Sequence, residues 1–235
     1  MKLEEITPES ISKITDAELK TLHEQCHTAT NAMKTEKLDI TMYKNMYDLY
    51  FSCQECQKCE LYKTRTNCIF NNGAIGSTIF VVGDKPTIEE NVIGEPFQGL
   101  SGEVLNKMMD IAGFNSTDDL YLTNIIKCAP TAEVDVLKIS QTCQPMWLDK
   151  EMELGKPKII IALGENAIRA VTGVEDGTIR TLHGKTYERA DNIKVFATYH
   201  PLDIIKDIKL QRYAFEDMIK LRAFLIKEFK NTILC

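Results

Sequence analysis

The chain has 235 residues, of which 44% are hydrophobic and 26% charged, and its formal net charge is −6. This composition is ordinary for a folded protein with one sizeable α/β domain, and no apolar run is long enough to span a bilayer. The first residues lack the apolar core of a signal peptide, so we expect a cytoplasmic protein with no membrane partner. The negative charge argues weakly against nucleic acid, although residues 155–235 carry 14 Lys and Arg against 10 Asp and Glu and can present a basic face.

The first fifty residues predict a helical hairpin that carries no evident chemistry. Apolar residues recur at helical spacing over Leu19–Cys26 and again over Leu38–Phe51. His23 and His27 lie four residues apart and could bind a metal from one helical face, but a structural role is favoured because no third ligand is evident. We therefore predict an N-terminal helical extension over residues 1–50.

The rest of the chain alternates short apolar, β-branched runs with helical stretches. This alternation predicts a parallel sheet that helices cover on both faces. For residues 51–235 we predict a three-layer α/β/α domain around a central four-stranded parallel sheet. The expected strands are Thr78–Val82, Leu120–Ile126, Lys158–Leu163 and Ile193–Thr198, and the expected helices are Gly102–Gly113, Val134–Leu154, Asn166–Thr172 and Asp207–Phe229.

Polar or conformationally special residues stand where the predicted strands end. Gly83 and Asp84 follow the first strand, Asn124 lies in the second, and His200 follows the fourth. The carboxyl ends of parallel strands meet at one edge of the sheet, which is the usual ligand crevice of open α/β folds. The loop after the first strand adds Phe97, which we do not expect in the core. These residues predict a functional site rather than a surface turn with one semi-buried aromatic.

The cysteines of the chain raise the question of metal binding. Eight cysteines in a cytoplasmic protein are not expected to form structural disulfides. Cys53, Cys56 and Cys59 have CxxCxxC spacing, and Cys128 and Cys143 each precede a turn with proline. Two of the first three and the two distant ones predict a four-thiolate site for zinc or a four-iron cluster, between which spacing does not decide. The other cysteines have no partner pattern and are predicted to be free thiols: Cys26, Cys68 and Cys235.

Together these motifs resemble the iron–sulfur uracil-DNA glycosylases, family 4 of the uracil-DNA glycosylase superfamily. The resemblance covers about residues 53–225 and its spacing matches throughout, so the combination is specific. It implies the three-layer α/β/α fold of that family. The segments that carry it are Cys56–Leu61 with Arg65–Asn67, Gly83–Pro86 with Glu90–Gly102, Asn124–Pro130, Cys143–Pro145, Pro157–Gly164 with Ala167, Leu182–Lys185 and Thr198–Pro201.

The resemblance implies a structural 4Fe-4S cluster and a base-binding site. The cluster ligands would be Cys56, Cys59, Cys128 and Cys143, with Cys53 as the spare. Gly83 would contribute to substrate binding, Phe97 would stack on a flipped-out uracil, and Asn124 would hydrogen-bond the pyrimidine edge. His200 would stabilise charge on the departing base, and Ser101 would contact a DNA phosphate.

A carboxylate would position the attacking water, and the sequence leaves Glu90 and Asp84 as candidates, with the spacing favouring Glu90. Several residues depart from the family pattern. Changes in the first motif could alter water activation, and changes from Arg would weaken phosphate contacts because Lys lacks the bidentate fork. The departures are Asp84 for Glu, Lys85 for a small residue, Thr87 for Gly, Asn91 for Asp, and Ala129 and Lys206 for Arg.

The leading hypothesis is therefore a monofunctional DNA repair glycosylase that flips uracil out of single- or double-stranded DNA and hydrolyses its N-glycosidic bond. An alternative is a glycosylase-like DNA-binding subunit with weak or no catalysis, in which residues 1–50 dock a replication or repair protein. A third interpretation is a zinc-stabilised nucleotide-binding domain.

Overall fold

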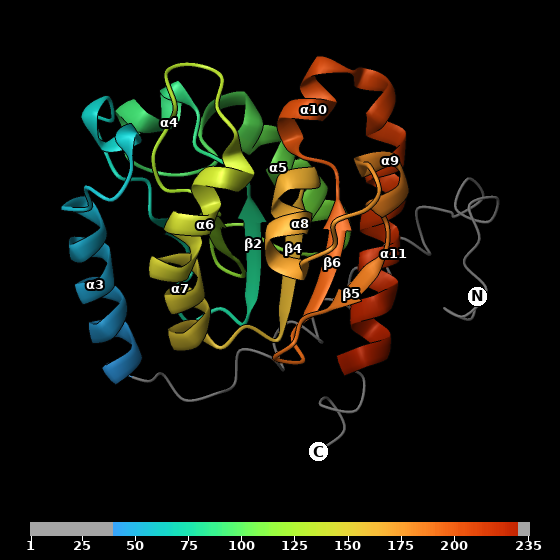
Figure 1. The fold of residues 1–235 in the computed structure, drawn as a ribbon. Coiled ribbons are helices and arrows are strands. Elements are labelled where there is room, and N and C mark those ends of the chain that lie inside the picture. Colours follow the sequence, from blue (N-terminus) through green and yellow to red (C-terminus); the bar gives the residue numbers. More distant parts are fainter. Residues whose placement is uncertain (1–39, 230–235) are drawn as a thin grey trace.

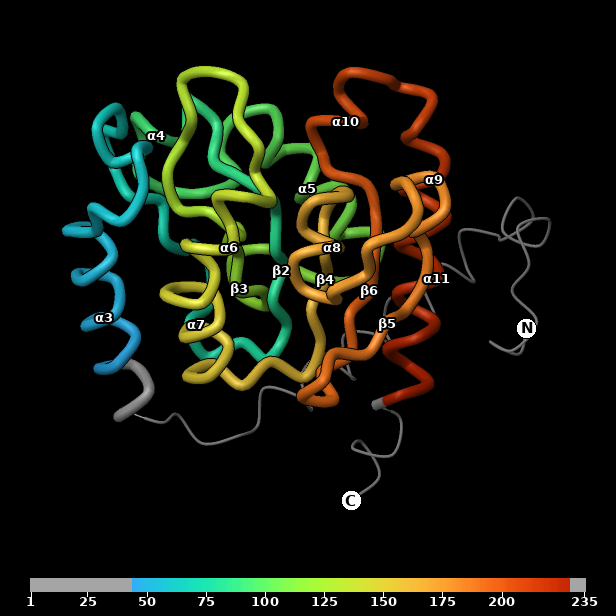
Figure 2. The backbone as a smooth tube through the Cα atoms, viewed as in Figure 1, coloured from blue at the N-terminus to red at the C-terminus, as the bar shows by residue number. Residues whose placement is uncertain are grey.

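A computed structural model describes residues 40–229 of the chain (Figure 1). Its centre is a six-stranded sheet in the order β1-β3-β2-β4-β6-β5. The chain paths of β3 and β2 lie side by side in Figure 2. The strands are β1 (Asn71–Gly73), β2 (Ile79–Gly83), β3 (Tyr121–Asn124), β4 (Ile159–Leu163), β5 (Thr186–Glu188) and β6 (Lys194–Thr198).

The four predicted strands form the parallel middle of this sheet, so the fold class is confirmed. The predicted number of strands was too small, because β1 pairs antiparallel with β3 at one edge and β5 pairs antiparallel with β6 at the other. Each edge strand has three residues, none of them fully buried. Such short, partly exposed segments lack the apolar alternation from which strands are predicted.

Alternating strand residues supply the core on each face of the sheet. In β2 every residue is buried, as expected for a parallel strand covered on both sides. Phe80 and Val82 belong to the core cluster on one face, whereas Ile79 and Val81 belong to the cluster on the other. The second strand ends earlier than predicted, at Asn124.

Helices cover both faces of the sheet and complete the three layers. Figure 1 shows α6, α7 and α8 in front of the sheet and α5 behind it. The front layer comprises α3 (Ile40–Gln54), α6 (Val136–Met146), α7 (Leu148–Gly155) and α8 (Glu165–Thr172). The back layer comprises α5 (Gly99–Ala112) and α11 (Gln211–Phe229). The shorter helical segments are η2 (Glu60–Lys63), α4 (Ile88–Ile93), α9 (Ile179–Leu182), α10 (Pro201–Lys206) and η3 (Ile208–Leu210).

Two predicted helices differ from those observed. The single helix expected over Val134–Leu154 is split into α6 and α7 at Trp147, which has φ −122° and ψ −68°. Pro145 lies just before the break, where it removes a helical hydrogen-bond donor. The last helix begins at Gln211, because η3 occupies the first residues of the predicted span.

The helix predicted over Leu38–Phe51 is α3, and it packs on α7 with Met46 buried in the front core cluster. The other predicted helix of the hairpin and both of its histidines lie outside the described residues. Within residues 40–229, no helix combines the length and the hydrophobicity needed to cross a membrane.

Candidate active site

The carboxyl ends of the parallel strands place the predicted site residues at one edge of the sheet, the upper edge in Figure 1. Gly83 is the last residue of β2 and pairs with Asn124, the last residue of β3. His200 follows β6 by two residues and is the N-cap of α10. These three residues are far apart in sequence and converge because their strands are close neighbours in the sheet.

Gly83 marks the point where the three predicted base-contacting side chains meet. A Cβ atom built on Gly83 would lie 2.9 Å from Cζ of Phe97 and 3.3 Å from Nε2 of His200, and it would clash with Oδ1 of Asn124. The backbone of Gly83 does not have a positive φ, so its conformation does not require glycine. Glycine is needed here because the three neighbouring side chains leave no room for a Cβ atom. The centroids of the Phe97 and His200 rings are 6.2 Å apart. The structure thus brings Phe97, Asn124 and His200 together, as predicted.

Burial of His200 favours the neutral imidazole, and one backbone hydrogen bond selects its tautomer. The backbone N–H of Leu202 donates to Nδ1 at 3.2 Å, so the proton of the neutral ring lies on Nε2. Burial lowers the pKa of His200, partly offset by the nearby Asp84 carboxylate. Nε2 is buried and has no hydrogen-bond partner among the described residues. A buried N–H donor is therefore left free to bind an oxygen atom.

Asn124 is held by the backbone but keeps its amide oxygen free. The residues that follow it are fixed to the first loop, since Ile125 N–H donates to Gly83 O at 2.9 Å and Ile126 N–H to Asp84 O at 3.2 Å. Oδ1 of Asn124 is buried and has no hydrogen-bond partner within the described part of the chain. Unpaired buried polar atoms are costly, and a bound ligand would pair this one.

Phe97 occupies a constrained turn before α5. Its φ is 55°, in the left-handed region that side chains seldom adopt. A side chain at Gly102 would clash with the Phe97 carbonyl, so Gly102 permits the close approach of this turn to the helix. Phe97 is only 7% exposed and belongs to the back core cluster. Our expectation that Phe97 is not a core residue was therefore wrong: its ring packs in the core and brings Cζ close to Gly83.

Glu90 uses its carboxylate to hold the loop that carries Phe97. Oε2 accepts from the backbone N–H of Thr87 at 2.8 Å, and the carboxylate also accepts from the backbone of Phe97 and Gln98. The hydroxyl of Ser101 lies at 3.5 Å from Oε1. Burial raises the pKa of Glu90, and the backbone hydrogen bonds oppose that rise. Glu90 therefore stabilises the conformation of the loop that carries Phe97.

Asp84 is the carboxylate that lies beside His200. Its Oδ1 atom is 3.7 Å from Nε2 of His200 and accepts from the N–H of Lys85 at 2.8 Å. Asn166, in α8, donates from Nδ2 to Oδ2 of Asp84 at 3.3 Å. Asn166 was not predicted as a site residue, because its contact with Asp84 arises only from the packing of α8 against the strand ends. Asp84 is half-buried, so water can reach it.

Other predicted or divergent residues serve the structure of this loop. Ser101 is buried and donates to the backbone oxygen of Gln98 at 3.0 Å, so the structure does not bring its hydroxyl to a surface where a phosphate could bind. Thr87 is the N-cap of α4 and forms a capping box with Glu90, which accounts for a hydroxyl at this position. Asn91 accepts from the N–H of Thr66 at 2.9 Å and fastens α4 to the preceding segment.

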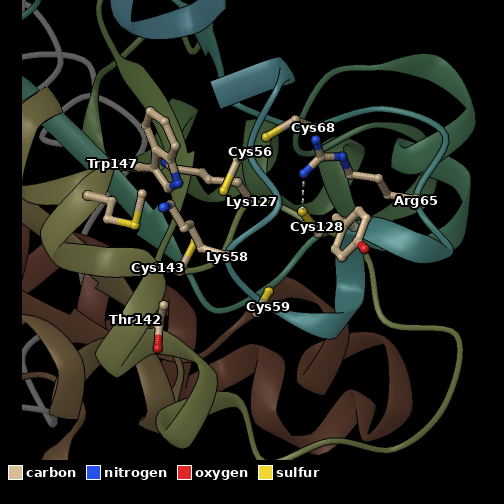
Figure 3. A pocket seen from close by; sticks show the side chains of 12 residues that line it. Cys56, Lys58, Cys59, Arg65, Cys68, Lys127, Cys128, Thr142, Cys143 and Trp147 are labelled. Atoms are coloured by element: carbon tan, nitrogen blue, oxygen red, sulfur yellow. Dashed lines mark hydrogen bonds between the residues drawn. The ribbon is translucent and has the colours of Figure 1, made fainter. Parts of the chain in front are cut away.

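The four predicted cluster ligands line one pocket, shown in Figure 3. Cys56 and Cys59 come from the loop after α3, Cys128 follows β3, and Cys143 lies in α6. Burial raises the pKa of the Cys143 thiol to about 12. Within residues 40–229, no three Cys, His, Asp or Glu side chains are close enough to hold a single metal ion. The four thiols instead surround a shared space between three segments.

Two further cysteines lie next to this pocket. Cys53 and Cys68 are buried, and their Sγ atoms are 2.7 Å apart. Cys68 is a free thiol, as predicted, but it contacts Cys53 and also lines the pocket. Sequence spacing gave no signal for it, because Cys68 approaches only through the turn after η2. Arg65 donates from Nη1 to Sγ of Cys128 at 3.2 Å and so places a positive charge at the thiol (Figure 3).

A buried ion pair connects the cysteine pocket to the sheet. Lys127 is 1% exposed, and its ammonium group lies 2.6 Å from Oε2 of Glu151 in α7. Thr123 and Tyr121, both in β3, donate to the same carboxylate at 3.1 and 2.9 Å. The stretch from Asn124 to Cys128 is therefore fixed at both ends, so the cysteine pocket and the strand-end site share one rigid segment.

Comparisons with known proteins match most of the chain to one family. The family model described as the uracil DNA glycosylase superfamily matches residues 70–219. The chain is 31% identical to a type-4 uracil-DNA glycosylase of Sulfurisphaera tokodaii over 185 residues, which cover 76% of this chain and 84% of the relative. A type-4 uracil-DNA glycosylase of Archaeoglobus fulgidus is 30% identical over 76% of this chain and 92% of its own length. A type-4 uracil-DNA glycosylase of Thermotoga maritima is 28% identical over 74% and 92%, respectively.

Proposed function

Because the chain belongs to the uracil-DNA glycosylase superfamily, we propose that it is a DNA repair glycosylase that hydrolyses the N-glycosidic bond of deoxyuridine. A base inside a duplex is out of reach, so the enzyme acts on a nucleotide that is flipped out or already unpaired. The observation that carries this proposal is the convergence of Asn124, Phe97 and His200 around Gly83. In that group, Oδ1 of Asn124 and Nε2 of His200 are buried and have no hydrogen-bond partner among the described residues. Uracil offers both a donor and an acceptor that could pair with them.

Recognition of uracil combines a stacking surface with an amide. The ring of Phe97 provides the surface, and stacking of a base on an aromatic ring contributes about 1–3 kcal/mol. Stacking does not separate uracil from cytosine, since both have a π-face. The amide of Asn124 does, because Oδ1 accepts from uracil N3–H while Nδ2 donates to O4. In cytosine both of these positions have the opposite hydrogen-bonding character.

His200 stabilises the departing base. Cleavage of the glycosidic bond leaves negative charge on the uracil and positive charge on the sugar. The Nε2–H group of neutral His200 donates to uracil O2, where the negative charge develops. The donor is already oriented by Leu202 and already desolvated, so little reorganisation is needed during the reaction.

Asp84 positions the water that attacks the sugar. Its carboxylate lies beside His200 and is partly accessible, whereas the carboxylate of Glu90 is committed to the backbone of the Phe97 loop. The negative charge of Asp84 also offsets the positive charge on the sugar. We therefore assign water activation to Asp84 and positioning of Phe97 to Glu90, although sequence spacing favoured Glu90 for the first role.

A 4Fe-4S cluster fits the cysteine pocket. Cys56, Cys59, Cys128 and Cys143 would hold it, because all four are thiols and they line one pocket. A bound cluster would supply structure rather than reaction chemistry: it would cross-link the loop after α3, the segment after β3, and α6. That cross-link would stabilise the segment from Asn124 to Cys128, which carries the amide proposed to read uracil.

The accessory-subunit alternative is not favoured, since the family model and the type-4 uracil-DNA glycosylases match most of the chain. The docking role suggested for residues 1–50 remains a proposal, because residues 1–39 are outside the described structure. The test of function is release of free uracil from a uracil-containing oligonucleotide by the wild-type protein. We expect release by wild type and a loss of about 10²- to 10³-fold in His200→Ala. The absence of release by cluster-containing wild type would refute the proposal.

A further inference from the structure

A second concave region lies beside the candidate active site, between α9, η3 and the start of α11. Two cavities adjoin there, because Arg180, Tyr199, Asp207 and Leu210 line both of them. The first has a volume of about 490 Å³, which is enough for a nucleotide. We call this first cavity the flank groove, and it is lined by Arg180, His183, Tyr199, Asp207, Lys209, Leu210, Arg212 and Tyr213.

The flank groove carries a positive charge in an otherwise acidic protein. Arg180, Lys209 and Arg212 contribute three cations, and Asp207 is the acidic residue among the lining side chains. The adjoining cavity differs, because Lys206 and Arg180 are there outnumbered by the carboxylates of Glu165, Asp203 and Asp207. Anion binding is therefore expected in the flank groove and not in its neighbour.

Aromatic rings line the same groove: Tyr199 is buried, and the half-buried rings of His183 and Tyr213 give the groove a surface for a base. The ring centroids of His183 and Tyr199 are 4.5 Å apart, and those of Tyr199 and Tyr213 are 6.4 Å apart. The guanidinium of Arg212 lies over the Tyr213 ring, 4.4 Å from its centroid. Alternation of cationic and aromatic side chains is the pattern of proteins that bind single-stranded nucleic acid.

His183 is fixed in this groove by a buried carboxylate. Its Nδ1 atom lies 2.9 Å from Oδ2 of Asp217, which also accepts from the hydroxyl of Thr198 at 2.9 Å. This contact leaves Nε2 as the remaining polar atom of the imidazole. Lys220 lies 3.7 Å from Asp217 on the same helix. The orientation of His183 is thus set from inside the domain, although nothing in the proposed reaction uses this residue.

The groove and the base site are connected through consecutive residues, since Tyr199 lines the groove and His200 reaches Gly83. We propose that the flank groove binds a neighbouring nucleotide of the same single DNA strand while the deoxyuridine occupies the base site. Its phosphate binds Arg180 and Lys209, and its base stacks on Tyr213. This inference deepens the proposed glycosylase function and rests on it for the identity of the strand.

The binding test uses the full-length protein and a fluorescent single-stranded oligonucleotide without uracil. Affinity is measured by anisotropy over a range of salt concentrations. Each phosphate contact contributes about 0.7 to the slope of log affinity against log salt for single strands. The double variant Arg180→Gln/Lys209→Gln removes the contact with one phosphate and should therefore lower the slope by about 0.7. The matched control is Lys107→Gln/Lys227→Gln, which removes two exposed lysines outside the groove and should leave the slope unchanged.

The same assay separates stacking from charge. Tyr213→Leu should weaken binding by about 5- to 150-fold without altering the salt slope, because it removes a ring and no charge. If the groove variants bind the oligonucleotide with the affinity and the slope of wild type, the inference is refuted. The same conclusion follows if the lysine control loses as much slope as the groove variant.

An activity test uses substrates of different length. Nucleotides are added to a minimal deoxyuridine substrate, first on the 5′ side and then on the 3′ side, and kcat/KM for uracil release is measured. Wild type should gain activity when the side that reaches the groove is extended. Tyr213→Leu should lose this gain and keep the wild-type rate on the minimal substrate. If Tyr213→Leu loses kcat/KM equally on minimal and extended substrates, the inference is overturned. If wild type releases no uracil from any substrate, the glycosylase function is refuted, and the binding test alone decides whether the groove binds a nucleotide.

Discussion

Asn124 and His200 direct two buried, unpaired polar atoms toward the same point above Gly83. Oδ1 of Asn124 is an acceptor, and Nε2 of His200 is a donor because Nδ1 accepts from Leu202. Leaving these two atoms without hydrogen bonds lowers the stability of the free protein. Both gain a hydrogen-bond partner when a pyrimidine with the matching edge binds.

Asn124→Asp removes one donor from the site while keeping the shape of the side chain. The amide donates to O4 of uracil, whereas a carboxylate places an acceptor against that oxygen. We therefore expect a loss of about 10²-fold in kcat/KM for uracil release. Steady-state kinetics on one oligonucleotide measure the loss. The melting temperature reports whether the fold is retained. Unchanged kinetics in a folded Asn124→Asp protein would show that the amide does not read the base.

Gly83→Ala places a methyl group among Phe97, Asn124 and His200. We expect uracil release to fall below detection, because that space is needed by the base and the side chains around it. The iron-dependent absorption should stay unchanged, since Gly83 is not one of the residues that line the cysteine pocket. Wild-type activity in Gly83→Ala would mean that the base binds elsewhere.

The pH dependence of the reaction reports on His200, whose pKa is lowered by burial. Catalysis by the neutral ring predicts a rate that is constant through neutral pH and falls only after acidification well below the usual pKa of about 6.5. A rate that rises on acidification would instead indicate the charged ring. The same shift affects stability: the unfolded chain binds a proton near pH 6.5 when the folded chain does not, so acidification through this range favours unfolding. His200→Gln should reduce this acid sensitivity in melting experiments.

We expect substitution of Asp84 to lower the catalytic rate and substitution of Glu90 to lower the stability of the fold. Asp84→Asn should lower kcat by about 10²- to 10⁴-fold with little effect on the melting temperature, because this carboxylate acts on water. Glu90→Gln should destabilise the fold by about 1–3 kcal/mol, because a buried acceptor of several backbone hydrogen bonds is altered. Glu103→Gln, on an exposed carboxylate of α5, serves as the control for both. If Asp84→Asn keeps full kcat while Glu90→Gln loses it without destabilisation, the two roles are reversed.

Cysteine substitutions test the ligand assignment by absorption spectroscopy. Cys128→Ala and Cys143→Ala should lose the broad visible absorption of an iron–sulfur protein and melt at lower temperature. Cys53→Ala should retain the absorption, since Cys53 contacts Cys68 and does not line the pocket. Loss of the absorption in Cys53→Ala with retention in Cys56→Ala would show that Cys53 and not Cys56 is the ligand.

Much of the fold could be predicted because the parallel strands are continuous apolar runs. Ile79–Gly83 and Ile159–Leu163 are buried along their whole length, and this pattern is visible in sequence. The edge strand Asn71–Gly73 could not be predicted, since its polar residues pair only because β3 lies beside them. The division at Trp147 was missed because apolar spacing continues through the break, although Pro145 was a usable signal.

The convergence of the strand-end residues could be predicted from the sequence, whereas the contacts of the two carboxylates could not. Residues at strand ends, such as Asn124 and His200, meet because the sheet topology requires it. The role of Glu90 depends on which backbone groups surround it, and spacing does not contain that information. The contact of Asn166 with Asp84 likewise arises from helix packing.

The most direct test of the central claim is a uracil-release assay on single-stranded, U:A and U:G oligonucleotides, with wild type and His200→Ala compared at equal iron content. We predict release of free uracil by wild type from at least one of these substrates and a rate about 10²- to 10³-fold lower for His200→Ala. No uracil from wild type, or equal rates for the two proteins, would contradict the account.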